Sequence, residues 1–288
     1  MKEHAMEHVL AAIDASAYAA SVCGYAGWAA QRLGLPVELL HVVQRQDAVT
    51  ERRDLSGAIG LGVKSELMEE LVRLSEASSR AEIEKGRVIL EAGEHLLRNA
   101  GVAEVTTLHR HGGVVETIVE REEAARLVVI GKRGMDHGYS PDHIGSIIER
   151  VVRASAKPVL IASRAFVPPS HVVFAYDASP AAKRALERLA NSPLFDGLPV
   201  TIVMAEAKGA AKRGELDRAQ ESFADSHEVT TLLDAGEAER VIPQVIAETP
   251  DPLLLMGAYG HSPIRRMIVG STTTEMIRTV KAPVLLVR

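Results

Sequence analysis

The stretch Leu253-Leu-Leu-Met-Gly257-Ala-Tyr-Gly260 is followed by nine residues and then by Gly270-Ser-Thr-Thr-Thr274. An apolar run typical of a strand ends at two glycines, and the chain then returns to a glycine and hydroxyl side chains at the start of a helical pattern. Glycine lets the backbone approach an anion closely, and the first N–H groups of a helix attract negative charge. This layout favours a phosphate-binding loop, with Ser271 and Thr272 as additional hydroxyl donors. The simpler alternative is a strand end, a turn and a helix cap.

The same landmarks occur twice in the chain, in the same order. The pairs are Asp14-Ala-Ser16 with Asp177-Ala-Ser179, Thr106-Thr-Leu108 with Thr230-Thr-Leu232, Gly131-x-x-Gly134 with Gly257-x-x-Gly260, Gly145-Ser146 with Gly270-Ser271, and Pro158-Val-Leu160 with Pro283-Val-Leu285. A tandem duplication explains this order. We therefore predict two domains, over residues 1–165 and 170–288, with a long and mainly helical insertion at about 45–100 in the first.

Short apolar runs alternate with longer helical patterns in each half, which indicates parallel sheets covered by helices on both faces. In the first half, the predicted strands are 8–13, 37–43, 104–108, 127–130 and 158–162, and the predicted helices are 16–33, 61–98, 114–125 and 145–154. In the second half, the predicted strands are 171–176, 200–205, 228–233, 253–256 and 284–287. Ser16 is expected to cap the first helix, which Gly34 ends.

Composition limits the kinds of function. The chain has 288 residues, a net charge of −5 and a single cysteine, Cys23. A negative charge argues against a general nucleic-acid binder, and one cysteine excludes an intrachain disulfide. The charged N-terminus and the lack of a long apolar run predict neither export nor membrane insertion, so we expect a cytoplasmic protein.

The glycine spacing G-x2-G-x9-G-S resembles the ATP-binding signature of the universal stress protein family, and the ordered landmarks extend this resemblance over essentially the whole chain. The resemblance implies two Rossmann-like α/β domains, each with a five-stranded parallel sheet of order 3-2-1-4-5. In ATP-binding members of the family, the acid after the first strand contacts ribose, the end of the second strand contacts adenine, and the glycine loop holds the phosphates. The residues that this implies for the second half are Ala175, Tyr176, Asp177, Ala205, Met256, Gly257, Tyr259, Gly260, Gly270, Ser271, Thr272 and Thr273.

A second nucleotide site in the first half would use Asp14, Val42, Gly131, Gly134, Gly145 and Ser146. This half departs from the signature, because its glycine loop is one residue longer and Ile147-Ile148 replace Thr272-Thr273. Isoleucine donates no hydrogen bond to a phosphate, so the second half is the favoured site. At both aspartates a turn or cap role remains the alternative.

Three functions stay open. The first is an ATP-binding stress-response regulator, with ADP or AMP as other ligands and Mg²⁺ as an accompanying ion. The second is a weak ATPase or autophosphorylating enzyme, which would need a placed nucleophile or base. The third is a stress-linked interaction protein with vestigial pockets. No catalytic residue is predicted.

Some further residues have a simpler explanation. His109-Arg110-His111 is interpreted as a polar strand end rather than a metal site, and the loop cations Lys132, Arg133, Arg265 and Arg266 are only secondary candidates for phosphate contacts. The apolar strands 158–162 and 283–287 would each lie at a sheet edge, and such edges need cover. We expect the two domains to pair through these strands within the chain, and a homodimer to form through another face.

Overall fold

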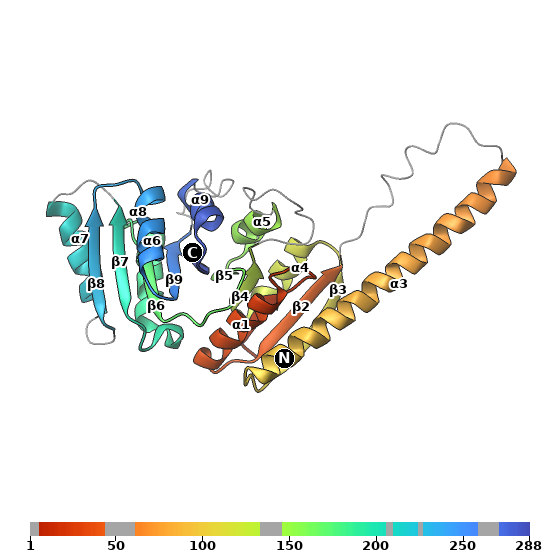
Figure 1. Cartoon of the computed structure of the whole chain (residues 1–288), viewed down its shortest axis with the longest axis horizontal. Coiled ribbons are helices and arrows are strands. Elements are labelled where there is room, and N and C mark those ends of the chain that lie inside the picture. Colours follow the sequence, from red (N-terminus) through yellow and green to blue (C-terminus); the bar gives the residue numbers. More distant parts are fainter. Residues whose placement is uncertain (1–5, 44–60, 133–145, 206–209, 224–226, 259–270) are drawn as a thin grey trace, which may run out of the picture.

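The computed structural model describes residues 6–43, 61–132, 146–205, 210–223, 227–258 and 271–288. Strands and helices alternate in both halves (Figure 1). The first half contains β1 (His8–Ala12), α1 (Ala19–Leu33), β2 (Val37–Val43), α3 (Leu61–Asn99), β3 (Val105–His111), α4 (Val114–Arg121), the 3-10 turn η1 (Glu122–Ala124), β4 (Ala125–Gly131), α5 (Ser146–Ala154) and β5 (Val159–Ala162).

The second half repeats this alternation. It contains β6 (His171–Ala175), α6 (Pro180–Asn191), the 3-10 turn η2 (Pro193–Phe195), β7 (Val200–Ala205), α7 (Ala210–Glu221), β8 (Val229–Asp234), α8 (Ala238–Glu248), β9 (Pro252–Gly257), α9 (Ser271–Thr279) and β10 (Val284–Val287). The α/β class predicted from the sequence is confirmed.

The described strands form one ten-stranded sheet in the order β3-β2-β1-β4-β5-β10-β9-β6-β7-β8. Within each half all neighbouring strands are parallel, and counted by half the order is 3-2-1-4-5 in both. The two five-stranded sheets meet where β5 and β10 run antiparallel, with Leu160 opposite Leu285. We call this β5–β10 ladder the seam.

Two buried layers, one on each face of the sheet, explain why these segments are strands. One layer lies under α1, α3, α6 and α7, and it includes Leu160 and Leu285. The other lies under α4, α5, α8 and α9, and it includes Ile161 and Leu286. Alternate residues of β5 and β10 thus enter opposite layers, so both layers continue across the seam.

The connection between the halves is packed against α1. The Tyr25 hydroxyl and Ser163 Oγ are 2.8 Å apart, and the Phe166 ring meets the Tyr25 ring edge-on at 4.9 Å. Gly24 makes room for this ring, since a Cβ there would lie 2.4 Å from Phe166 Cγ. The short proline-containing linker therefore holds β5 and β6 in a defined relation.

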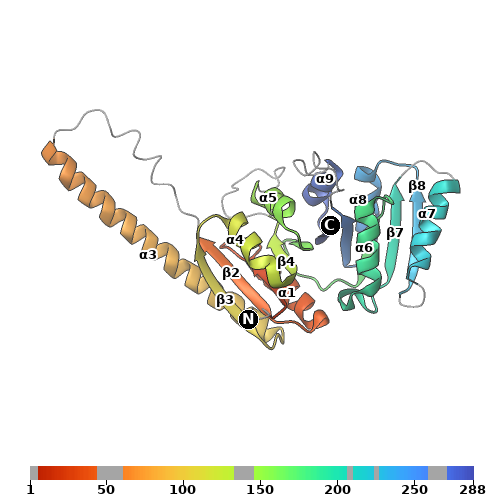
Figure 2. The same ribbon diagram turned by 180° about the vertical axis from the view of Figure 1, so that it is seen from behind.

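Helix α3 has 39 residues, against 12 in its counterpart α7. Its C-terminal part packs on β2 and β3 with Leu90 and Leu97 buried, whereas Val72 and Leu74 are more than half exposed. Figures 1 and 2 show its N-terminal part extending away from the sheet. The predicted helix at 61–98 thus corresponds to α3.

The predicted start of the first helix is wrong. α1 begins at Ala19, its N-cap is Tyr18, and no side chain caps it. Ser16 Oγ instead accepts a hydrogen bond from Tyr18 N at 3.3 Å, one turn before the helix. The predicted helix 114–125 is likewise shorter, because α4 ends at Arg121 and the turn η1 follows.

Candidate functional site

The candidate site of the second half lies where β6 and β9 end side by side. Ala175, the last residue of β6, pairs with Met256, and Gly257 ends β9 one position further. Tyr176 and Asp177 follow β6 directly, so the structure brings them to the same edge as Gly257. The carboxyl edge of a parallel sheet is where such folds bind ligands.

Asp177 forms a turn and remains exposed. Its Oδ1 accepts a hydrogen bond from Ser179 N at 2.9 Å, and Ser179 Oγ accepts one from Ala182 N at 3.2 Å as the N-cap of α6. The turn role that the sequence left open is therefore real. Within the described part of the chain, Oδ2 of Asp177 makes no hydrogen bond, so one carboxylate oxygen faces solvent.

Asp14 forms the corresponding turn in the first half. Its Oδ1 accepts a hydrogen bond from Ser16 N at 3.0 Å, and its side chain is half-buried. The serines of the two turns have different roles. Ser179 caps α6, whereas Ser16 does not cap α1. The same Asp-Ala-Ser sequence thus gives the same turn and two different helix starts.

Gly257 has a packing role of its own. A Cβ at this position would lie 2.6 Å from Ala182 N and 2.7 Å from the carbonyl carbon of Ala181. These are backbone atoms of the first turn of α6, which therefore contacts the end of β9 directly. Glycine is required here by this helix contact, whether or not a phosphate also binds.

Tyr176 points into the core rather than into the site. Its side chain is 4% exposed and its ring lies 5.4 Å from that of Phe174. Burial raises the pKa of its phenol further above neutral pH. Only the backbone of Tyr176 remains for ligand contacts, and its N–H donates to Val203 O at 2.9 Å.

Ala205 ends β7 and pairs with Asp234 of β8. It lies two positions after Val203, which pairs with Ala175, so it is level with Asp177 along the sheet. The structure therefore places the residue predicted to contact adenine beside the residue predicted to contact ribose.

At the start of α9, Ser271 is exposed and Thr272 is already engaged. The Thr272 hydroxyl donates to Glu239 Oε1 at 2.6 Å, and this hydrogen bond is the main reason that the pKa of Glu239 is lowered. The sequence analysis missed Glu239, which lies in the first turn of α8 and puts a carboxylate next to the predicted phosphate donors. Thr273 is half-buried in the same turn of α9.

Several predicted site residues lie outside the described residues. They are Tyr259, Gly260 and Gly270 of the second half, Gly134 and Gly145 of the first, and the loop cations Arg133, Arg265 and Arg266.

In the first half, the structure places the remaining candidates as follows. Gly131 ends β4 and pairs with Ala162, Val42 lies in β2 opposite Arg110, and Ser146 begins α5.

Ile148 is buried in the core and Ile147 packs against it. Lys132 donates from Nζ to Val280 O at 2.7 Å, so this cation binds the other half across the seam.

His109 is less peripheral than predicted, whereas Arg110 and His111 are exposed at the end of β3, as predicted. His109 lies between His41 and His111, with ring centroids 5.3 and 5.5 Å away. Its Nε2 is buried without a partner in the described structure, and Gly86 of α3 leaves just enough room for the ring. Burial, His41 and His111 lower the pKa of His109. Among the described residues, no three His, Cys, Asp or Glu side chains are placed to hold a metal.

A model of the universal stress protein family matches residues 6–163 and 203–288. The chain belongs to the universal stress protein family. The match covers the first repeat and most of the second, and it omits β6, the turn at Asp177, α6, η2 and the start of β7. A curated relative, universal stress protein Slr1230 from Synechocystis, is 32% identical over 289 residues, covering 98% of this chain and all of the relative.

Solved structures show the same fold. A universal stress protein from Archaeoglobus fulgidus has a TM-score of 0.69 at 21% identity, covering 97% of this chain and 95% of that one. A protein from Pseudomonas aeruginosa has a TM-score of 0.57 at 15% identity, covering 98% and 93%. Both superpose over the full tandem chain. In the described part of this universal stress protein, no helix is long and apolar enough to span a membrane.

Proposed function

We propose that this universal stress protein is a stress-response regulator that binds an adenine nucleotide, chiefly in its second half. ATP is the favoured ligand, with ADP and AMP as alternatives. The observation that carries the proposal is the exposed Oδ2 of Asp177, which is free to accept hydrogen bonds from a ribose at the edge that β6 and β9 share. Family membership supports it.

The second half is preferred because the starts of α5 and α9 differ. α9 begins with hydroxyl side chains, whereas Ile148 at the equivalent place in α5 is directed into the core. Glu239 complicates a triphosphate site, since its carboxylate would repel the phosphates. Mg²⁺ would offset the negative charge of Glu239, and the Thr272 hydroxyl could then donate either to this carboxylate or to a phosphate.

A direct experiment compares two aspartates that form the same turn. Asp177→Asn keeps the Oδ1 acceptor of the turn but removes the negative charge, and Asp14→Asn does the same in the first half. We expect Asp177→Asn to weaken ATP binding at least about tenfold and Asp14→Asn to change it less than about threefold, measured by calorimetry with and without Mg²⁺. The reverse ranking would move the site to the first half, and no binding by the wild type would overturn the proposal.

The nucleotide that accompanies the purified protein identifies the ligand. Denaturation followed by anion-exchange chromatography would release ATP, ADP or AMP at close to one per chain. A regulator should turn ATP over slowly, so sustained phosphate release at about 10 per second, an ordinary enzyme rate, would instead favour an ATPase.

We also propose the architecture of the working protein. Residues 1–165 and 170–288 would be two domains that stay paired through the seam, and the chain would form a homodimer in the cytoplasm. The β5–β10 ladder supports the pairing. Light scattering after gel filtration tests the homodimer, and cell fractionation tests the location.

A further inference from the structure

A cavity of about 270 Å³ lies at the junction of the two halves. Its walls come from the end of α1, the start of β4, α6, the turn η2 and β10. On this face α1 packs mainly on β1 and β4, and α6 mainly on β9, so the seam strands are covered least. The residues of the proposed nucleotide site take no part in its lining.

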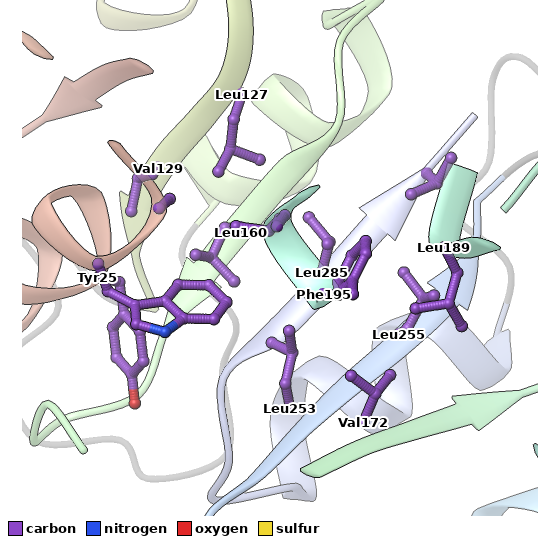
Figure 3. Packing of buried hydrophobic residues seen from close by; sticks show 14 of the residues in the cluster. Tyr25, Leu127, Val129, Leu160, Val172, Leu189, Phe195, Leu253, Leu255 and Leu285 are labelled. Atoms are coloured by element: carbon purple, nitrogen blue, oxygen red, sulfur yellow. The ribbon is translucent and has the colours of Figure 1, made fainter. Parts of the chain in front are cut away.

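The wall formed by η2 is held from the other half. Arg32 of α1 donates from Nε to Leu194 O at 2.6 Å, and it also donates to the carbonyl of Asp196. Ser192 Oγ accepts from Leu194 N at 3.3 Å and fixes the start of the turn. Figure 3 shows Phe195 of this turn next to Leu285 of the seam. The cavity is therefore preformed by both halves together.

Most of the inner surface is apolar. Leu127, Leu285 and Phe195 form its deepest lining, and only their outermost atoms reach the cavity, because each residue is at most 3% exposed. An apolar cavity of this kind favours an aliphatic or aromatic group over water.

The mouth of the cavity carries a positive charge excess. Arg126 and Arg188 line it together with one carboxylate, that of Glu187. Arg126 lies 3.5 Å from Glu7 in an exposed ion pair. Arg188 has no hydrogen bond or ion pair with another described residue, and a guanidinium can hold a carboxylate with two parallel hydrogen bonds.

We propose that this cavity binds a small amphipathic carboxylate, with its apolar body against Leu127, Leu285 and Phe195 and its carboxylate on Arg188. At roughly 30 Å³ per non-hydrogen atom, similar to the share of a water molecule, the volume suits a ligand of about ten such atoms. A medium-chain fatty acid such as octanoate has this size and polarity.

Calorimetry on the full chain tests the proposal with octanoate and with octanol, which has the same chain and no charge. We expect saturable binding of one octanoate per chain, with a dissociation constant on the order of 0.1 mM. Octanol should bind at least about tenfold more weakly. The absence of saturable octanoate binding, or equal affinity for the two compounds, would overturn the proposal.

Two variants and a control locate the ligand. Arg188→Gln should reduce octanoate affinity to that of octanol and leave octanol unaffected, whereas Arg184→Gln, on the same helix but outside the lining, should change neither. Asn191→Trp places a large ring at the exposed mouth and should abolish binding of both compounds. Melting curves establish that each variant is folded. Octanoate binding that survives both Arg188→Gln and Asn191→Trp would show that the ligand binds elsewhere.

Discussion

Gly257 lies where the end of β9 meets the first turn of α6. From the glycine spacing alone, Gly257 was predicted to belong to a phosphate-binding loop. The contact with Ala181 and Ala182 was not visible in the sequence, because it joins residues about 75 positions apart. A glycine signature can therefore record helix packing as well as ligand approach.

Gly257→Ala should destabilise the fold even without nucleotide. The added Cβ would lie 2.6 Å from a backbone nitrogen, so α6 must shift, at a cost of about 1–3 kcal/mol. Urea unfolding of the nucleotide-free protein measures this. Gly214→Ala in α7 is the matched control, since a Cβ there meets nothing within 4 Å and should stabilise by roughly 0.5–1 kcal/mol. Equal effects of the two substitutions would contradict the packing role.

The aspartate turns were half predictable from the sequence. Asp-x-Ser after a strand indicated either a turn or a ligand contact, and the structure contains the turn in both halves. Glu239 was missed because its relation to Thr272 depends on how α8 packs on α9, which local spacing does not encode.

At the scale of elements, α3 combines a packed part and an unpacked part in one helix. Gly86, Leu90, Gly93 and Leu97 are buried against the body, whereas the described side chains from residue 76 to 81 are exposed. Most of the stability of helices in proteins comes from tertiary packing, so the unpacked part depends on propensity and on exposed pairs such as Arg80 with Glu76.

Hydrogen exchange should divide α3 in two. We expect the amides of residues 70–81 to exchange at least about a hundredfold faster than those of residues 86–97, because only the second group opens with the core. Mass spectrometry of peptides from the exchanged protein resolves the two parts. Uniformly slow exchange along the helix would mean that the exposed part is covered in solution.

The packing of α3 also predicts a pH dependence. The pKa of His109 is below its usual 6.5, so the folded state favours the neutral ring. This contribution to stability is complete above pH 6.5 and is lost as the pH falls through 6.5 towards the lowered value. His171, whose pKa is also lowered by burial, acts with the same sign.

We therefore expect the free energy of unfolding to decrease between pH 7.5 and pH 5.5. His109→Gln should reduce that decrease, while His95→Gln on the exposed side of α3 should not. Urea titrations at the two pH values measure it. A pH dependence that is identical in the wild type and His109→Gln would show that the half-buried ring contributes nothing.

Most strands could be predicted because each is a short apolar run between turn residues, and the structure places them within about three residues of the predicted ends. One helix start, that of α1, was not predicted correctly. The segment 16–18 has the polarity of a helix start, but the turn that Asp14 and Ser16 form delays α1 to Ala19.

At the scale of the whole molecule, the seam makes two repeats into one sheet. In each half alone, the outermost strand, β5 or β10, would be an open sheet edge although all its residues are buried in the full chain. The side chains of Leu160 and Leu285 are essentially fully buried and directly opposite each other, so their apolar surface is removed from water only when the halves meet.

Leu160→Asp combined with Leu285→Asp should disrupt this pairing. Two facing carboxylates in a buried layer should cost more than about 4 kcal/mol, so we expect aggregation or two separate unfolding transitions. Calorimetric melting measures it. Leu74→Asp, at an exposed position of α3, is the control and should melt like the wild type. Wild-type melting of the double variant would exclude the seam as the contact between the halves.

The order of synthesis on the ribosome determines when the seam can form. Leu285 follows Leu160 by 125 positions, so during translation β5 exists for several seconds before β10 can pair with it. In that interval the first half presents an uncovered apolar edge, which invites pairing with another nascent copy. The seam should therefore form late in folding, and synthesis rate or chaperone supply, rather than final stability alone, should govern the yield of native protein.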